Sequence, residues 1–302
     1  MTADERVLIL YDRRANAGAA WALRRAATAR GANAHVRFLG TDRPGAGDAF
    51  AEVVEELVDV DVVVAFTSSS ALTSPAAHVT VAHGGRVVTM TGADERMLTH
   101  GAIEADFTEL APTCELFAAK VTDAVEAEVQ SANGTKIRMS LRGRSGVPNP
   151  PGRPRAGVFR APYAGVVVAP VENSVDGTIV VDVSTSFGQV DSPVTILLEH
   201  GRVVAVTGGA AAQQIERMLA DTDDPLSGTV GVVGFGMNPA ASVCGVISQD
   251  VAMAGTGHLS LGPNRGIGGA SDGHAYVELV YAQPTLFLNG AKVMRDGAIA
   301  DL

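Results

Sequence analysis

The sequence predicts an α/β protein, with an N-terminal doubly wound, parallel-sheet domain over residues 1–130 and a β-rich α+β domain over residues 131–302. Two observations support this fold class. Short apolar runs alternate with helical patterns from the start of the chain, which is typical of βαβ units. After residue 131 the pattern changes, and strand-like runs follow one another between turn residues. A length of 302 residues is sufficient for two such domains.

In the first domain, strands and helices are expected to alternate. The expected strands are VLILY (7–11), HVRFL (35–39), VDVVVAF (60–66) and RVVTM (86–90). The expected helices are WALRRAATARG ending at residue 31, then 50–57 and 71–82, and one or two helices over 104–130. Because each helix would connect parallel strands, this order predicts a Rossmann-like layer arrangement.

A proline- and glycine-rich stretch, GVPNPPGRPRAG, interrupts regular structure and is expected to be a loop. Beyond it lie the strand-like runs GVVVAP, TIVVDVS, VTILLEHG and RVVAVTGG, with one helix over 210–220. The dipeptides HG, NG and DG mark tight turns. The second domain is therefore predicted to be a mixed sheet with few helices, and it is expected to carry the active site.

Charge and terminal sequence indicate the kind of partner. The chain has 23 Lys and Arg against 33 Asp and Glu, a formal charge of −10, which disfavours nucleic acid and anionic lipid. The segment MTADERVLIL has neither the basic n-region nor the long apolar h-region of a signal peptide, and no apolar run approaches the roughly 20 residues that span a bilayer. A cytoplasmic protein with a small-molecule substrate is expected, without nucleic-acid or membrane partners.

The segment HAYVEL (274–279) is expected to be a strand with an unusual polar face. On a period of two, His274, Tyr276 and Glu278 share one side. One interpretation is the solvent-facing side of a half-exposed strand. The other is a pocket wall, in which His274 acts as a base, Tyr276 donates a hydrogen bond and Glu278 is a metal ligand or proton acceptor.

A second histidine, His258, follows GTG, where glycines allow the backbone to approach a ligand closely. A lone histidine in a glycine-rich loop is usually a hydrogen-bonded structural residue. Together with His274 it supplies two imidazoles, one ligand fewer than the smallest common catalytic set. Glu278, Asp272 and Asp250 are the candidates for the carboxylate that would complete a His, His, carboxylate triad.

Three further polar residues are candidates for substrate binding. GFGMNP looks like a phosphate loop, but Pro239 stands where the pattern needs a glycine, so a tight turn presenting Asn238 is expected instead. Asp250 and Asp272 are the other candidate substrate-binding residues.

Several segments in collinear order resemble the superfamily of aminopeptidase T metallopeptidases and 2,5-dihydroxypyridine 5,6-dioxygenases. These segments include APVENSVDGTIVVDVS, GRVVAVTGG, GFGMNP, GTGHLSLG and GGASDGH. The resemblance implies a two-domain enzyme, commonly dimeric, with metal in its C-terminal domain. Its peptidase branch carries two metal ions on Glu, His, Tyr and Asp, whereas its dioxygenase branch holds one non-haem iron on two His and one Asp.

The chain departs from both ligand patterns. Gly165 stands where the resemblance implies a glutamate, Val232 where it implies another ligand, and Tyr276 where it implies the aspartate of a His-x-Asp pair. His258 and His274 match the two histidines. Too few anionic oxygens remain to neutralise two divalent cations. Classical aminopeptidase activity is therefore not expected.

The leading hypothesis is ring-opening oxygenation of a polar cyclic or heteroaromatic metabolite at one Fe(II), held by His258, His274 and Glu278. The alternative is metal-independent hydrolysis or isomerisation of an amide or cyclic substrate by His274 and Tyr276, with no cofactor. A mononuclear zinc hydrolase and a non-catalytic binding protein are further alternatives. A homodimer is expected from the resemblance alone.

Overall fold

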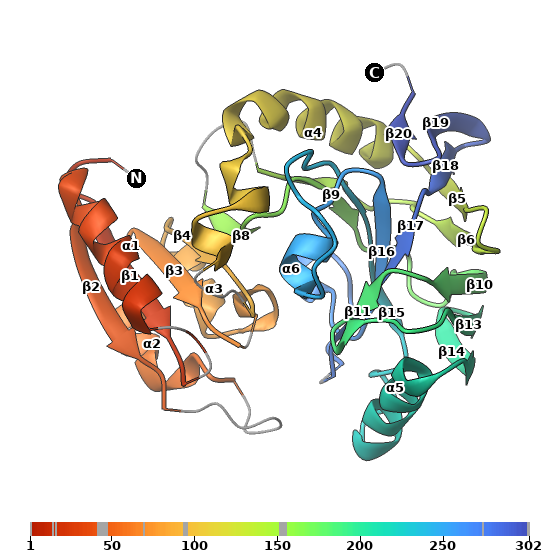
Figure 1. The fold of residues 1–302 in the computed structure, drawn as a ribbon, viewed down its shortest axis with the longest axis horizontal. Helices are drawn as coiled ribbons and strands as arrows, with labels where there is room; N and C mark the ends of the chain where they lie inside the picture. The colour runs from red at the N-terminus through yellow and green to blue at the C-terminus, as the bar shows by residue number, and fades with distance from the viewer. Residues whose placement is uncertain are drawn as a thin grey trace. The chain divides into compact units, whose positions relative to one another are not determined.

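The computed structural model describes residues 2–13, 15, 17–40, 48–68, 70–92, 96–150, 156–273 and 275–300. The chain divides into two compact units (Figure 1). Unit 1 comprises Met1–Glu104 and Arg153–Pro162, and unit 2 comprises Ala105–Gly152 and Tyr163–Leu302. Among the described residues, no helix is long and apolar enough to cross a membrane.

Unit 1 is a doubly wound α/β layer. Its five-stranded parallel sheet has the order β2-β1-β3-β4-β8. The strands are β1 (Arg6–Tyr11), β2 (Asn33–Phe38), β3 (Val62–Phe66), β4 (Arg86–Thr89) and β8 (Gly157–Arg160). The helices are α1 (Ala17–Ala29), α2 (Val54–Val58) and α3 (Ala77–Ala82). The predicted α/β fold class is confirmed for this part of the chain.

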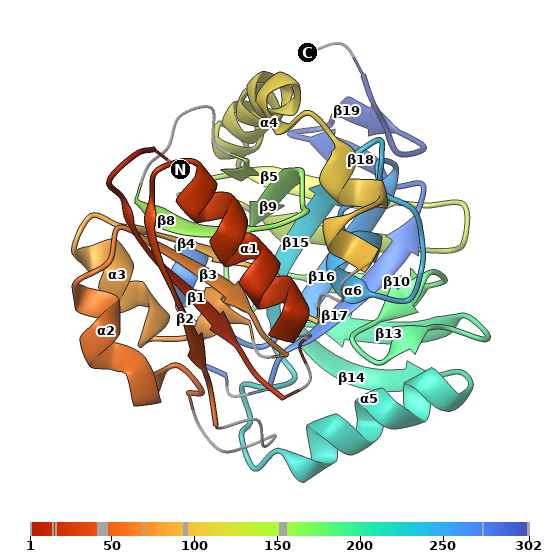
Figure 2. The same ribbon diagram turned by 60° about the vertical axis from the view of Figure 1, so that its left-hand side comes forward.

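Alternating side chains of this sheet bury both of its faces. Leu8, Leu10 and Val63 pack with Leu57 of α2 and Ala77 of α3 in one apolar cluster. The α1 helix contacts β1 and β2 and lies in front of the sheet in Figure 2. Helices on both faces explain why the strands are near-continuous apolar runs.

Unit 2 contains two antiparallel sheets, not one mixed sheet. The larger, sheet B, has the order β14-β13-β10-β6-β5-β18-β19-β20, and the other, sheet C, has the order β12-β11-β17-β16-β15-β9-β7. Every strand pair recorded in these two sheets is antiparallel. Hairpins and short connections produce this arrangement, since parallel pairing would need crossover segments of a dozen or more residues.

The strands of sheet B are β5 (Glu126–Gln130), β6 (Lys136–Ser140), β10 (Asp176–Val181), β13 (Val194–Glu199), β14 (Arg202–Thr207), β18 (Thr285–Leu288), β19 (Ala291–Arg295) and β20 (Ala298–Ile299). Those of sheet C are β7 (Val147–Asn149), β9 (Gly165–Val168), β11 (Ser184–Thr185), β12 (Gly188–Gln189), β15 (Val230–Gly236), β16 (Thr256–Leu261) and β17 (Val277–Ala282). The helices are α4 (Phe107–Thr122), α5 (Ala210–Asp221) and α6 (Ile247–Asp250).

One apolar core joins the two sheets of unit 2. Ile137 and Ile196 of sheet B, Phe235 and Leu259 of sheet C, and Phe117 of α4 belong to the same buried cluster. Each strand contributes alternate residues to this core, so the opposite face of sheet C is available for other side chains.

The unit boundary and three elements differ from the sequence analysis. Residues 105–130, expected in the first domain, belong to unit 2, because α4 packs on sheet C strands and β5 pairs with β6 and β18. The helix expected over 104–130 ends at Thr122. The helix expected over 71–82 is a short 3-10 turn followed by α3. The strand expected from residue 274 begins at Val277.

The tight turns occur where the glycine dipeptides predicted them. The hairpins between β13 and β14, β18 and β19, and β19 and β20 turn at His200-Gly201, Asn289-Gly290 and Asp296-Gly297, and both residues of each pair have positive φ. Consecutive positive φ values match the right-handed strand twist, which explains these turn residues.

Candidate functional site

His258 lies in the middle of β16, completely buried. It pairs with Val280 of β17 on one side and with Gly234 of β15 on the other. A Cβ atom on Gly234 would lie 2.3 Å from His258 Cε1 and 2.4 Å from Nε2, so the imidazole occupies the space of the missing side chain. The Tyr163 ring meets it edge to face, with centroids 5.6 Å apart. The ring is therefore held in place by its neighbours.

Glu278 is buried in β17 with a relative exposure of 3%. Its carboxylate oxygen Oε1 accepts a hydrogen bond from Tyr276 Oη at 3.0 Å, and its backbone N–H donates to Ser186 Oγ at 2.9 Å. A buried carboxylate is costly unless it is hydrogen-bonded or paired with a charge. The Tyr276 hydroxyl supplies one such bond and orients the carboxylate.

His258 and Glu278 share one face of sheet C. Leu259 and Leu279 point into the core cluster, so their neighbours along the strands point to the opposite face. His258 is opposite Val280, two residues from Glu278, and diagonal neighbours of this kind lie about 7–8 Å apart. An imidazole and a carboxylate can therefore reach the same small ligand or ion. His274, the third predicted ligand, lies outside the described residues.

The other predicted binding residues make loop contacts. Asn238 is buried and its Oδ1 accepts from Ala240 N at 3.0 Å. The buried Asp250 carboxylate accepts from the backbone N–H groups of Cys244 at 2.8 Å and Gly245 at 3.1 Å. These contacts give both side chains a structural role in holding turns, and their contact with substrate stays a prediction.

Asp272 differs because it is exposed at the surface. Its carboxylate forms an ion pair with Arg265, with Nε 2.5 Å from Oδ1. The hydrogen bond and positive charge of Arg265 hold the pKa of Asp272 below its usual value. An exposed, already paired carboxylate is a weaker candidate for a metal ligand than the buried Glu278.

The structure explains why Gly165 cannot be exchanged for the glutamate that the resemblance implies. A Cβ atom there would lie 2.1 Å from the Phe235 carbonyl oxygen and 2.7 Å from Tyr163 Oη. That hydroxyl donates to the same carbonyl at 3.0 Å. With Val232 opposite Ser260, the positions of two implied ligands hold no donor side chain, so a two-metal site does not fit.

A single metal ion fits the donor chemistry better. Within the part of the chain that the structure describes, no three His, Cys, Asp or Glu side chains are gathered to hold a metal ion. The described donors are the His258 imidazole and the Glu278 carboxylate, a combination typical of non-haem Fe(II) sites when a second histidine joins them. His274 is the histidine predicted for that place, and its role as a ligand stays a prediction.

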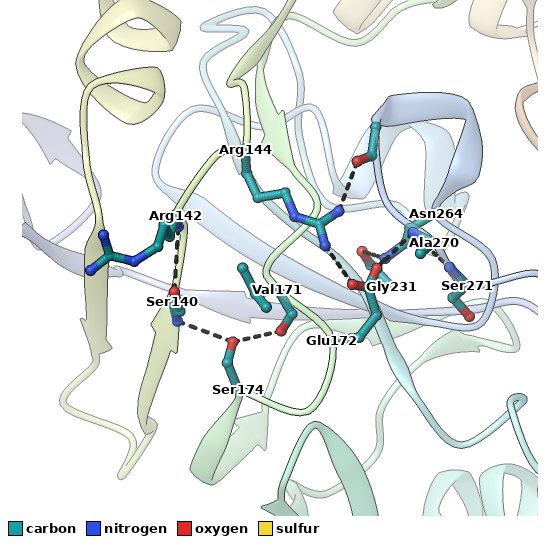
Figure 3. Close-up of polar contacts among 11 residues, drawn as sticks. Ser140, Arg142, Arg144, Val171, Glu172, Ser174, Gly231, Asn264, Ala270 and Ser271 are labelled. Carbon is teal, nitrogen blue, oxygen red and sulfur yellow. Dashed lines mark hydrogen bonds and ion pairs between the residues drawn. The ribbon is translucent and has the colours of Figure 1, made fainter.

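Sequence reasoning missed a polar cluster that anchors the glycine-rich loop before β17 (Figure 3). Glu172 accepts from Ala270 N at 2.7 Å and from Asn264 Nδ2 at 3.2 Å, and it forms an ion pair with Arg144. Arg144 also donates to Gly268 O at 2.7 Å. These partners are far apart in sequence, so no local motif indicated them. We call Arg144, Glu172, Asn264 and Ala270 the loop anchor.

The surroundings of Glu172 in the loop anchor favour the charged form of its carboxylate. Burial alone would raise the pKa of Glu172, but the Ala270 N–H, the Asn264 amide and the Arg144 guanidinium together hold it below its usual value. Asn264 is itself buried, and its Oδ1 accepts from Ser271 N at 2.8 Å. The loop leading to Tyr276 is therefore tied to the rest of unit 2 by charge-assisted hydrogen bonds.

An open hollow of about 520 Å³ lies over β5, β6 and β18 of sheet B. Its lining includes Glu128 and Arg138, which form an ion pair with each other, and Phe287. His258 and Glu278 belong to sheet C, so this hollow is separate from the candidate site.

The chain thus combines a parallel α/β unit with an antiparallel two-sheet unit, and the second unit carries a buried imidazole and a buried carboxylate on one face of sheet C. The family model of NicX, described as 2,5-dihydroxypyridine 5,6-dioxygenase, matches residues 1–301. The chain belongs to this family, and it is a dioxygenase-like small-molecule enzyme by that membership.

Solved structures show the same fold. The chain is similar to 2,5-dihydroxypyridine dioxygenase from Pseudomonas putida KT2440, with a TM-score of 0.84 and 18% identity over 99% of this chain and 92% of that one. It is also similar to wild-type AmpT from Thermus thermophilus, with a TM-score of 0.67 and 13% identity over 100% of this chain and 95% of that one. The comparison with curated proteins gave no significant match.

Proposed function

We propose that this protein is an Fe(II)-dependent dioxygenase that opens the ring of a small polar cyclic or heteroaromatic metabolite. His258, His274 and Glu278 would hold the metal. The observation that carries the proposal is the position of buried His258 and buried Glu278, diagonal neighbours on one face of sheet C. Family membership supports the reaction class, because the matching model is that of a ring dioxygenase.

When bound, Fe(II) on two histidines and one carboxylate supplies open coordination positions for O₂ and for a chelating substrate. The protein's own side chains position the reactants. Gly234 and Tyr163 fix the His258 ring, so its nitrogens have little freedom to move. The Tyr276 hydroxyl orients Glu278 and can hold a proton close to a polar ring substituent.

The test is metal content and oxygen uptake. Protein purified without an affinity tag and reconstituted anaerobically is expected to retain one iron per chain and to consume O₂ with 2,5-dihydroxypyridine as the first substrate tried. Glu278→Gln is expected to lower iron retention at least tenfold. The matched control is Glu199→Gln, which alters an exposed glutamate of β13 and should leave iron retention unchanged. Full iron content in Glu278→Gln would remove Glu278 from the metal site.

The Tyr276–Glu278 hydrogen bond also supports a second candidate, metal-independent hydrolysis or isomerisation with His274 as base and Tyr276 as donor. The metal analysis separates the candidates. Activity without any metal would favour the second one, and stoichiometric zinc would favour a mononuclear zinc hydrolase. Absence of both metal and activity would favour a binding protein.

A further inference from the structure

Two serines on the site face of sheet C carry buried hydroxyls that the structure leaves unpaired. Ser184 of β11 and Ser260 of β16 are both 0% exposed. Neither Oγ atom has a hydrogen-bond partner among the described residues. Native proteins pair nearly all buried polar groups, and leaving one unpaired costs about 1–3 kcal/mol. These two hydroxyls therefore need an explanation, such as a ligand.

The sheet register places both serines around the candidate site. Ser260 lies directly opposite Glu278, while Ser184 lies directly opposite Val280. Val280 in turn lies opposite His258. Residues directly opposite each other in an antiparallel sheet point to the same side. The apolar Val280 is thus surrounded on one face by four polar side chains, two of them already in the proposed metal site.

The register also gives the span between the two hydroxyls. β11 and β16 are the two neighbours of β17, and the two serines are offset by two residues along it. Two strand spacings and this offset put their Cα atoms about 12 Å apart. Side chains stand roughly perpendicular to the sheet, so the hydroxyls are separated by a similar distance.

A bound molecule must bridge this span with its own polar atoms. Two hydrogen bonds of about 2.8 Å leave about 6 Å between the ligand atoms that would reach both serines. Substituent oxygens on opposite corners of one six-membered ring are separated by about this distance. Substituents on adjacent or on alternate carbons of the same ring lie closer together, so they fall short of the span between the two serines.

We propose that Ser184 and Ser260 are specificity-determining residues that bind two neutral polar substituents on opposite sides of a single-ring substrate. This inference rests on the proposed function, because it concerns the same site. Serine hydroxyls both donate and accept, so they suit hydroxyl or carbonyl groups. A charged substituent would need a counter-charge, which neither serine supplies.

The experiment compares three rings bound by the protein as purified, measured by calorimetry without oxygen: hydroquinone (1,4-dihydroxybenzene), resorcinol (1,3-dihydroxybenzene) and phenol. Wild type is expected to bind hydroquinone at least tenfold more tightly than resorcinol or phenol. Ser184→Ala and Ser260→Ala should each lower the affinity for hydroquinone about tenfold and leave the affinity for phenol within a factor of two or so.

Tyr281→Phe provides a matched control. Tyr281 also has a buried hydroxyl without a partner among the described residues, but it belongs to the core cluster on the opposite face of β17. This variant should bind all three rings as wild type does. The thermal unfolding temperature of both serine variants should be unchanged or slightly raised, since no hydrogen bond among the described residues is lost.

Equal affinity for hydroquinone and resorcinol, or equal losses for hydroquinone and phenol in the serine variants, overturns the inference. If such a result accompanies turnover of 2,5-dihydroxypyridine, the proposed function stands and only the serine assignment fails. A serine-dependent preference for hydroquinone without ring opening supports the serine assignment and counts against the proposed function. Failure of all three rings to bind overturns the serine assignment. If the protein also does not turn over 2,5-dihydroxypyridine, the proposed function is overturned as well.

Discussion

Replacement of Gly234 by alanine tests whether the position of the His258 ring matters for metal binding. The added Cβ would lie 2.3 Å from Cε1 and 2.4 Å from Nε2 of that ring, and 2.9 Å from Val167 Cγ1. An ordinary contact begins at 3.4 Å, so the imidazole must move by about 1 Å. Ligand distances in metal sites tolerate about 0.2 Å, which makes such a shift large.

We expect Gly234→Ala to lower Fe(II) affinity at least tenfold and to reduce unfolding free energy by about 1–3 kcal/mol, the usual cost of overpacking. The affinity is measured by anaerobic equilibrium dialysis and the stability by urea unfolding. The control is Gly228→Ala, where the nearest atom is a Leu219 methyl at 3.8 Å. Wild-type iron affinity in a folded Gly234→Ala protein would show that His258 is not a metal ligand.

Substitutions at three further positions have defined outcomes. Gly165→Ala should lower the unfolding free energy measured with urea by about 3 kcal/mol, because its Cβ would collide with the Phe235 carbonyl. Gly165→Glu should bind no second metal ion, as measured by metal analysis. Tyr281→Phe should leave stability unchanged or raise it by up to about 1 kcal/mol in thermal unfolding, since it removes an unpaired buried hydroxyl. Glu172→Gln should lower the unfolding free energy by about 2 kcal/mol at neutral pH. Because the folded-state pKa of Glu172 is lowered, its contribution is present above the unfolded pKa of about 4.3 and is lost as pH falls through the folded pKa. If the difference in unfolding free energy between wild type and Glu172→Gln stays constant as the pH is lowered through the acid range, that reasoning is contradicted.

The fold was predictable where local pattern and tertiary structure agree. The alternation of apolar runs and helices correctly indicated the parallel sheet of unit 1, and the helix expected over 210–220 is α5. Residues 126–130 were assigned to a helix because the apolar spacing over 104–130 is that of one or two helices. Pairing with the neighbouring β6 and with the distant β18 decided their structure, and the long-range pairing with β18 leaves no local signal.

The candidate site was predictable only in part. Residue types singled out His258, Tyr276 and Glu278, and the structure brings the last two into hydrogen-bonding contact. Ser184 and Glu172 were missed for the same reason. Ser184 lies opposite Val280, and Glu172 bonds to Asn264 and Ala270; these partners are more than 90 positions away, and neither residue stands in a recognisable motif.

The interrupted course of the chain through unit 1 affects how the protein is made and dissected. β8 is the edge strand beside β4, yet it follows roughly 50 residues that belong to unit 2. A nascent chain stopped after Glu104 lacks that edge strand, so β4 is left with unpaired backbone groups until translation has passed Arg160. Neither half can be excised as one uninterrupted piece, and fragments cut at a single site will be prone to aggregation.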